Sequence, residues 1–236
     1  MFTLSKRAGW AMMIACFSVL SLTTSCTKDN PEPEPIPTGD AKVQFVNALS
    51  GSAAQEFYIG GTRFGTQVTA YGQASGYSTT NTSNSLFAFK DAGSTAATAA
   101  NATTSLSRPL TIGGSYTFYY FRSSTNVKAV GYLSDDTSAP ASGRAKVRFV
   151  HLNSFIAQTI PLTISVQGSA TPLVNNVVAD SSTDYYEVDA TSKFTVTGLS
   201  SPVTFNNLTL VAGKIYTIWL GGTTATEITG NLVLQN

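Results

Sequence analysis

Short segments in which apolar and polar residues alternate recur from residue 41 to the end of the chain. They are rich in β-branched and aromatic residues and are separated by Gly, Asn, Ser or Pro, which is typical of β-strands joined by turns. No window has the spacing of an amphipathic helix. The opening strand, 43–47, places Val43, Phe45 and Asn47 on one face. Further strands are predicted at 56–59, 86–89, 116–121, 127–133, 162–166, 185–188, 194–196, 208–211, 215–220 and 228–234.

Two sequence segments repeat one domain length apart. The first half opens with Ala-Lys-Val-Gln-Phe-Val at Ala41 and the second with Ala-Lys-Val-Arg-Phe-Val at Ala145. Near the end of each half, Leu110–Phe118 matches Leu210–Ile218 through a shared Leu, Gly, Tyr and Thr. The period exceeds the roughly 20–50 residues of solenoid repeats, so it indicates a tandem pair of domains. We predict a first β domain at 41–134, a turn-rich linker at 135–143 and a second β domain at 144–236.

Regularly spaced short strands are typical of sandwiches, so the predicted fold is all-β, with two tandem β-sandwich domains of immunoglobulin-like form. The Cys-Trp-Cys pattern of true immunoglobulin domains is absent, which leaves the strand topology open. We expect Gly113 and Gly213 in the turns that precede the strands beginning at Tyr116 and Tyr216. The Ala/Thr/Ser-rich block at 93–107 has no strand periodicity and is predicted to be a loop.

Aromatic residues occupy both faces of the strand at 116–121. Three of them share one face, whereas Tyr119 and Phe121 point the other way, as Trp219 does in the second half. A single sandwich core needs only one such face, so two interpretations stay open. The second face is covered by the loop at 93–107 or by the partner domain, or Tyr119, Phe121 and Trp219 form an exposed platform that binds a ligand.

Residues 1–25 have the three parts of a secretory signal. Lys6 and Arg7 give the positive region, Trp10–Leu22 is mostly apolar but too short for a spanning helix, and small residues lead to Cys26. The pattern resembles a bacterial lipoprotein signal, although Leu22 stands four residues before the cysteine and such signals usually have Leu three before. We predict lipidation at Cys26 and, through this anchor, a membrane partner.

Residues 26–40 form the lipidated N-terminus and a spacer. Alternating Pro and Glu from Pro31 to Pro37 favours extended polyproline II. Lys28 and Asp29 resemble the Lys-acidic surface-export signal of Bacteroidota lipoproteins. The predicted location is the cell envelope, as an outer-membrane lipoprotein that faces either the cell surface or the periplasm.

Composition narrows the classes of partner. Charged residues make up 11% of the chain and the formal net charge is +1, with no basic stripe, so no nucleic-acid partner is expected. Of the two cysteines, Cys16 lies in the signal peptide and Cys26 is assigned to the lipid. The mature domains therefore have no pair of cysteines for a disulfide and depend on their packed cores for stability.

The repeated elements resemble the domain-of-unknown-function family numbered 4397. That family opens with a strand like Ala-x-Val-Arg-Phe-Val-Asn, here Val43–Asn47 and Val147–His151, and has a Gly-x-x-Tyr-Thr strand start at Gly113–Thr117 and Gly213–Thr217. The similarity covers residues 41–236 almost entirely. It implies a β fold and a lipid-anchored or secreted location, and it brings no established catalytic residues.

Candidate catalytic groups are sparse. His151 is the single histidine, so a zinc site of three or four His and Cys ligands is not expected, and we interpret His151 as structural. The carboxylates Asp180, Asp184, Glu187 and Asp189 are spaced unlike a calcium loop and fit a solvated strand rim. No catalytic residue, metal or cofactor is predicted.

These observations favour a non-catalytic, envelope-anchored lipoprotein, a binding or adhesion module for a glycan or an envelope protein. The first alternative is a structural or assembly component of the envelope without a small ligand. The second is a carbohydrate- or peptidoglycan-acting enzyme that uses carboxylates among Asp180, Asp184 and Glu187.

Overall fold

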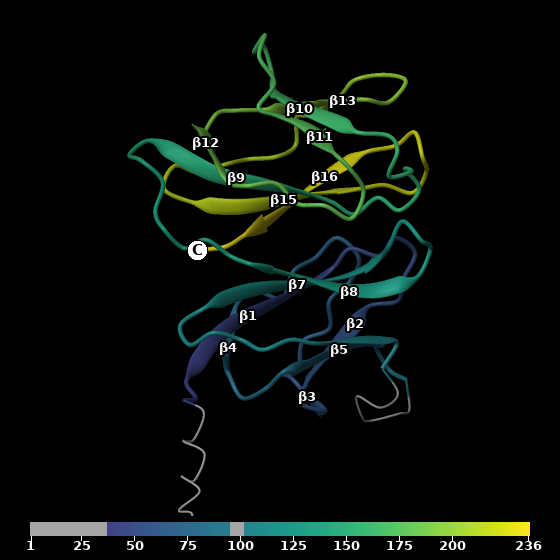
Figure 1. Ribbon diagram of the computed structural model, residues 1–236, viewed down its shortest axis with the longest axis vertical. Helices are drawn as coiled ribbons and strands as arrows, with labels where there is room; N and C mark the ends of the chain where they lie inside the picture. The colour runs from purple at the N-terminus through teal and green to yellow at the C-terminus, as the bar shows by residue number, and fades with distance from the viewer. Residues whose placement is uncertain (1–36, 95–101) are drawn as a thin grey trace, which may run out of the picture. The chain divides into compact units, whose positions relative to one another are not determined.

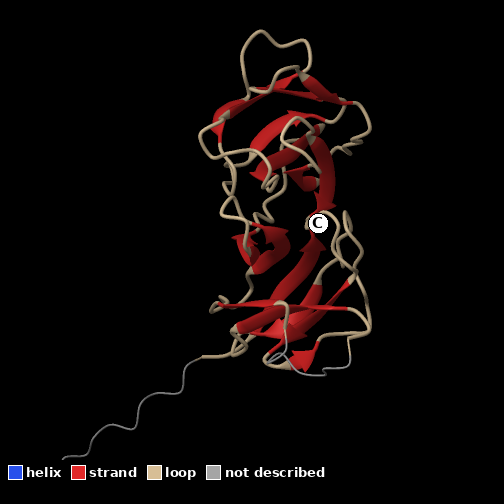
Figure 2. Ribbon diagram, turned by 90° about the vertical axis from the view of Figure 1, so that its right-hand side faces the viewer, coloured by secondary structure: helices blue, strands red, loops and turns tan. Residues whose placement is uncertain are grey.

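The computed structural model describes residues 37–94 and 102–236, which belong to one structural unit. Every regular element in the described ranges is a strand (Figure 2). In these ranges no helix long and apolar enough to cross a membrane is found. The predicted signal peptide, Cys26 and most of the spacer lie outside the described residues.

Among the described residues, each half contains eight strands in the same order. The first half contains β1 (Asp40–Asn47), β2 (Gln55–Ile59), β3 (Thr62–Arg63), β4 (Ser78–Asn81), β5 (Leu86–Asp91), β6 (Thr104–Ser107), β7 (Ser115–Arg122) and β8 (Lys128–Ser134). The second contains β9 (Arg144–His151), β10 (Leu162–Val166), β11 (Val174–Val177), β12 (Tyr186–Asp189), β13 (Phe194–Thr197), β14 (Val203–Phe205), β15 (Ile215–Gly221) and β16 (Thr229–Leu234).

The two halves share one sheet topology (Figure 1). The first half has sheets in the order β4-β1-β7-β8 and β3-β2-β5-β6, and the second has β12-β9-β15-β16 and β11-β10-β13-β14. The first strand of each half runs parallel to the seventh, β1 with β7 and β9 with β15, whereas the other paired strands are antiparallel. The two sheets of each half enclose an apolar core, which confirms the predicted all-β sandwich fold.

The two cores are filled by different side chains. In the first half Phe45 stacks on Phe57 with ring centroids 4.3 Å apart, and Phe87 stacks on Phe118 at 4.1 Å. The second core is mainly aliphatic and joins residues of both its sheets, including Val147, Ile164, Val196 and Ile218. Offset aromatic stacking and aliphatic packing both remove apolar surface from water, so each half has its own hydrophobic source of stability.

The repeated Leu-x-x-Gly-x-x-Tyr element forms the same corner in both halves. Gly113 and Gly213 have φ values of +75° and +82°, a conformation that a side chain disfavours. The Tyr116 hydroxyl accepts a hydrogen bond from the backbone N–H of Thr111 at 2.9 Å. The Tyr216 hydroxyl accepts one from Val211 at 3.1 Å. Immunoglobulin-like sandwiches use a tyrosine corner of this kind, so the repeated motif has a structural role.

Two of the predicted elements differ from the structure. The segment 208–211 is not a strand: Leu208 and Leu210 are buried, but the backbone runs into the tyrosine corner and its hydrogen bonds go there. The predicted loop at 93–107 ends in a strand, because residues 104–107 form β6 and pair with β5. Residues 95–101 of that segment lie outside the described residues.

The second faces of the central strands in the two halves are buried together. One apolar cluster contains Val46 and Tyr119 of the first half with Val150 and Trp219 of the second. The mixed face of β1 is therefore buried as well as its core face, and burial along β1 is nearly continuous. Of the two interpretations of the aromatic strand, the structure supports covering by the partner half.

Beside this cluster lie polar residues that occupy equivalent positions in the two halves. The equivalent residues are Gln44 and Arg148, Tyr77 and Tyr185, Thr117 and Thr217, and Asp135 and Gln235. The Gln44 Nε2 donates to Thr117 Oγ1 at 2.9 Å and the Arg148 Nε donates to Thr217 Oγ1 at 2.8 Å. In each half, a side chain of the first strand thus donates to a threonine of the seventh strand, but Gln44 is neutral and Arg148 is charged.

Asp135 is the centre of this polar network. Its Oδ2 accepts hydrogen bonds from Tyr77 and Thr117, and its Oδ1 accepts from Gln235 at 2.7 Å and from Arg148. Desolvation raises the pKa of Asp135, and the charge of Arg148 opposes that rise. Asp135 is the first residue of the predicted linker, and no residue from 135 to 143 lies in a strand.

Candidate ligand-binding groove

The structure contradicts the predicted aromatic platform. The exposed fractions of Tyr119, Phe121 and Trp219 are 1%, 8% and 0%, and all three belong to the apolar cluster between the halves. They cannot contact a ligand in this arrangement, because the second half covers the face of Tyr119 and Phe121 and the first half covers that of Trp219. The prediction that these three residues bind a ligand is therefore wrong.

Three of the four clustered carboxylates, all except Asp184, bond to separate partners. Asp180 accepts hydrogen bonds from Ser124, Glu187 accepts one from the backbone N–H of Ala141, and Asp189 pairs with Arg144. In residues 37–94 and 102–236 no group of three His, Cys, Asp or Glu side chains has the arrangement of a metal site.

His151 is fully buried at the end of β9. Its Nδ1 accepts a hydrogen bond from the backbone N–H of Asn153 at 3.3 Å, and its Nε2 has no partner among the described residues. Burial lowers the pKa of His151 to about 4, although the nearby charge of Asp180 acts in the opposite direction. The imidazole is therefore neutral in the folded protein at neutral pH.

The depressed pKa of His151 predicts a loss of stability in acid. The unfolded chain binds a proton near pH 6.5 that the folded chain does not bind until about pH 4. The contribution is fully present above pH 6.5 and falls by about 3 kcal/mol as the pH drops to 4 and below. We expect His151→Asn, which introduces the residue found at Asn47, to remove this dependence. Urea unfolding of both proteins at pH 7.5 and 4.5 tests it, and equal pH dependence would contradict the assignment.

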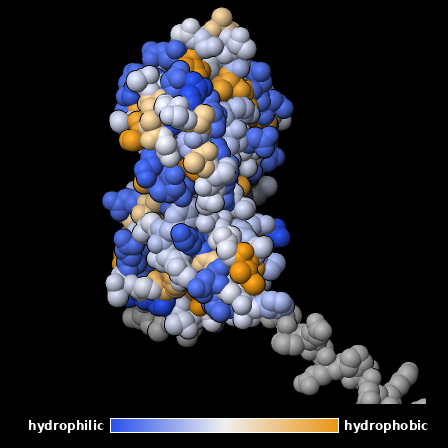
Figure 3. Space-filling model, turned by 90° about the vertical axis from the view of Figure 1, so that its left-hand side faces the viewer, coloured by the Kyte–Doolittle hydropathy of each residue, from blue (hydrophilic) through white to orange (hydrophobic). Residues whose placement is uncertain are grey.

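Isolated apolar side chains on the surface do not define a site. The exposed large hydrophobic residues include Ile112, Val127 and Phe155. On the face drawn in Figure 3 the hydrophobic residues form small patches separated by hydrophilic ones. Scattered exposure of this kind is ordinary for a folded protein.

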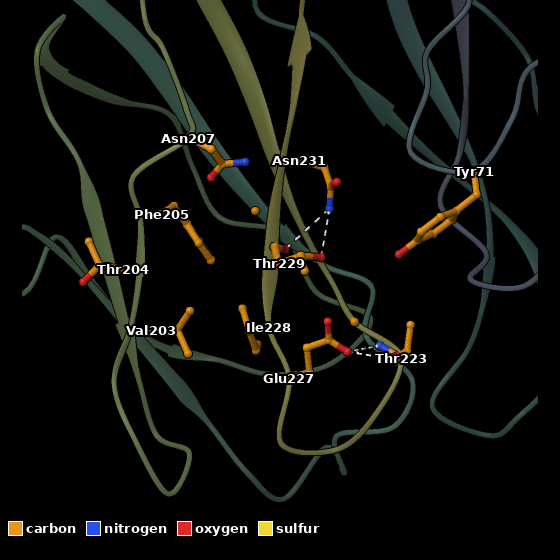
Figure 4. A pocket seen from close by; sticks show the side chains of 12 residues that line it. Tyr71, Val203, Thr204, Phe205, Asn207, Thr223, Glu227, Ile228, Thr229 and Asn231 are labelled. Carbon is orange, nitrogen blue, oxygen red and sulfur yellow. Dashed lines mark hydrogen bonds between the residues drawn. The ribbon is translucent and has the colours of Figure 1, made fainter.

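A groove with a volume of about 410 Å³ lies beside β14 and the start of β16 (Figure 4). It is lined by Tyr71, residues 203–205, Asn207, Gly222–Thr223 and residues 227–231. Its volume is in the range of small-ligand sites, roughly 300–1,000 Å³. Its lining combines aromatic, amide, hydroxyl and carboxylate groups.

The floor of the groove depends on a glycine. The ring of Phe205 lies directly against Gly230, where an added Cβ would come within 2.7 Å of the ring. Phe205 is nearly fully buried and caps the second core. Any larger residue at 230 would displace this ring, so Gly230 keeps Phe205 in its position in the lining of the groove.

The loop between β15 and β16 is held in place by hydrogen bonds from a buried side chain. The buried Asn153 side chain donates hydrogen bonds to the carbonyl oxygens of Thr224 at 3.1 Å and Glu227 at 2.8 Å. Gly222 allows this close approach, since a Cβ there would lie 2.3 Å from the Glu227 carbonyl oxygen. The loop is therefore held in place without a ligand.

Glu227 is the charged group of the lining. Its Oε2 accepts hydrogen bonds from the Thr223 backbone N–H at 3.1 Å and the Thr223 hydroxyl at 2.5 Å. These bonds lower the pKa of Glu227, which favours its ionised form. Asn231 is oriented by a bond from its Nδ2 to Thr229 Oγ1 at 3.3 Å.

Tyr71 belongs to the first half and rests on the apolar cluster. Its ring is 5.9 Å from that of Trp219 at an interplanar angle of 72°. Figure 4 shows its hydroxyl directed toward the other lining residues. Sequence reasoning missed Tyr71, Asn207, Glu227 and Asn231, because they lie in turns and a strand start and share no motif.

The fold and the groove define a β-sandwich protein with a candidate ligand site. The chain belongs to the family described as Domain of unknown function (DUF4397), whose sequence model matches residues 41–158. The family resemblance of the repeated strands is thereby confirmed. The match begins at β1 and extends through β9 into the second half.

Two solved structures are similar at low identity. One is CBMbc (family CBM26) from Eubacterium rectale Amy13K in complex with maltoheptaose, at 11% identity, covering 84% of this chain and 97% of that chain with a TM-score of 0.25. The other is the Bacillus anthracis TIE protein, at 10% identity, covering 79% and 34% with a TM-score of 0.23. Comparison with curated proteins gives no match. At these TM-scores neither similarity indicates a function.

Proposed function

We propose that the protein is a non-catalytic binding module, held in the cell envelope by a lipid on Cys26. The observation that carries the binding role is the braced groove beside β14 and β16. Its loop is fixed by Asn153 and its floor by the contact of Phe205 with Gly230. A site that is already formed before its ligand arrives loses less entropy on binding, which is the arrangement expected of a recognition surface.

The chemistry of the lining supports binding over turnover. Most glycosidases hydrolyse the glycosidic bond with two carboxyl groups that flank it. Among the described residues that line the groove, Glu227 is the single carboxylate, and Thr223 occupies one of its oxygens. Amides and hydroxyls, by contrast, are groups that orient a ligand.

The proposed location rests on the N-terminal sequence. A positive region, an apolar stretch and a cysteine followed by a Pro/Glu spacer support export and lipid anchoring in the outer membrane. The protein would face either the cell surface or the periplasm, and digestion with protease on intact cells, compared with lysed cells, distinguishes these two faces.

Lipid anchoring gives a direct prediction. Cys26→Ala should move the protein from the detergent-soluble membrane fraction to the aqueous fraction, because the acyl chains supply about 0.8 kcal/mol for each buried methylene. Phase partitioning and intact mass of the purified chain measure this change. Cys16→Ala is the matched control and should stay in the membrane fraction. A Cys26→Ala protein that still partitions into detergent would refute the anchor.

The binding role is tested with the full chain and isolated cell envelopes. We expect saturable binding to envelopes, reduced by Glu227→Lys, which reverses the charge of the groove. Glu187→Lys, on the same half but outside the groove, is the control and should bind as the unchanged protein does. Binding that is absent, or that does not saturate, would count against the proposed function.

A further inference from the structure

We propose that the groove beside β14 and β16 binds a neutral saccharide, which deepens the proposed binding function and rests on it. A sugar ring has an apolar face of C–H groups and a polar rim of hydroxyls. A site for it therefore needs an apolar platform next to planar side chains that both donate and accept hydrogen bonds. The groove places these two kinds of group together.

Tyr71 is the platform. Its ring is half-buried and is held by its edge-to-face contact with Trp219, so its orientation is fixed. The side chain points into the groove with its hydroxyl toward the other lining residues (Figure 4). An aromatic ring held in this way offers apolar area at a low cost in conformational entropy, together with one polar atom at its tip.

The polar partners are Asn207, Glu227 and Asn231. An amide presents a donor and an acceptor side by side, which matches two neighbouring hydroxyls of a sugar. Thr229 orients Asn231 through its Nδ2, and the Asn231 Oδ1 has no partner among the described residues. Thr223 likewise bonds the Oε2 of Glu227, and Oε1 has no partner in the described part of the chain. Glu227 and Asn231 are thus oriented, and each still has an acceptor for a ligand.

The charge of the lining selects among saccharides. Glu227 is ionised and is the single charged side chain among the described lining residues. A uronic acid or a sulfated sugar would bring a second negative charge to it, and like charges in contact disfavour a wrong partner. The ligand class is therefore a neutral glycan. The volume of about 410 Å³ fits a chain end or a short stretch.

The test uses the full chain, purified in detergent, on an array of neutral hexose and N-acetylhexosamine oligosaccharides with uronic-acid and sulfated counterparts. The strongest neutral probe is then titrated by calorimetry. We expect Tyr71→Ala to weaken its affinity more than tenfold and Asn207→Ala to weaken it about five- to tenfold. Asn206→Ala is the matched control, because Asn206 is exposed and lies outside the lining. Its affinity for the probe should stay within about twofold of that of the unchanged protein.

Folding is checked separately, because Tyr71 also packs on Trp219. Tyr71→Phe keeps the ring and should retain most of the affinity and the unfolding midpoint. Glu227→Gln keeps one acceptor oxygen but removes the charge, so it should weaken neutral probes only a few-fold and should admit anionic ones that the unchanged protein rejects. This change in selectivity does not arise from a mere loss of stability.

The outcomes separate the two proposals. Binding to cell envelopes without binding to any neutral glycan would overturn the saccharide assignment and leave the binding function standing. Neutral glycan binding that Asn207→Ala affects no more than Asn206→Ala would overturn the assignment to this groove. Failure to bind envelopes and glycans alike would remove both proposals.

Discussion

Replacing Asp135 by Gln is expected to lower the free energy of unfolding by about 3–5 kcal/mol, which corresponds to roughly 10 °C in the unfolding midpoint. The Arg148 and Asp135 side chains are 4% and 0% exposed, so the guanidinium would be left in the interior without its counter-charge. Its remaining bonds, to Thr217 and the Ser134 carbonyl, are to neutral groups and do not neutralise it.

A second substitution makes this expectation specific. Gln44 and Gln235 already occupy the positions equivalent to Arg148 and Asp135, so Asp135→Gln with Arg148→Gln gives both halves the same neutral network. We expect the double variant to recover most of the stability that each single variant loses, with a coupling of about 2 kcal/mol or more. Urea unfolding of the four proteins measures the cycle.

Asp136→Gln is the matched control for Asp135→Gln, because it removes the charge of the neighbouring residue. Its ion pair with Lys146 is partly exposed, with side-chain exposures of 36% and 11%. Pairs of this kind contribute about 0–1 kcal/mol, so the loss should be small. If the two single losses at Asp135 and Arg148 were simply additive in the double variant, the buried pair would not be the source of either.

The charges of this network also specify which halves pair. Asp135 bonds to Gln235, its own equivalent across the contact. In the same arrangement, two copies of the first half would place Asp135 against Asp135. Two copies of the second half would leave Arg148 without the carboxylate of Asp135, because Gln235 stands at the equivalent position. A like-charge contact and an uncompensated buried charge disfavour these two pairings. Divergence of the repeats at these positions therefore favours contact between unlike halves of one chain.

Much of the fold could be predicted from the sequence because its causes are local. The alternation of apolar and polar residues predicts β2, β5, β7 and β10 close to their observed bounds. The repeated glycine and tyrosine likewise indicate the turn and strand start at the tyrosine corner. The strands that were missed, such as β4 and β6, are short and consist mainly of Thr, Ser and Asn. Their pairing is fixed by the neighbouring strand and not by their own residues, so no local pattern marks them.

The site could not be predicted for a related reason. Tyr119 and Trp219 were candidates because aromatic residues on a second strand face suit either a ligand or a partner sheet, and sequence does not distinguish the two. The groove depends instead on Tyr71 and Glu227, which are far apart in the chain and meet through the packing of the two halves. Only the tertiary structure brings them together.

Trp219→Ala is expected to cost about 3–5 kcal/mol, because truncating a fully buried large side chain removes apolar burial and leaves a cavity. Trp219 is 0% exposed, and its ring packs over Gly221, where a Cβ would come within 2.5 Å of it. Its Nε1 has no partner among the described residues, so the loss comes from packing and not from a broken hydrogen bond. Circular dichroism during urea unfolding measures it.

Trp219→Ala has a control variant, Phe155→Ala, and a second measurement, the binding of the neutral saccharide. Phe155→Ala removes an aromatic side chain that is 51% exposed, and a loss within about 0.5 kcal/mol is expected. Because Tyr71 rests on Trp219, the Trp219→Ala protein should also bind the neutral saccharide more weakly, whereas Phe155→Ala should not. A loss of stability below about 1 kcal/mol for Trp219→Ala would mean that the cluster between the halves is not closely packed in solution, and the fixed platform at Tyr71 would lose its support.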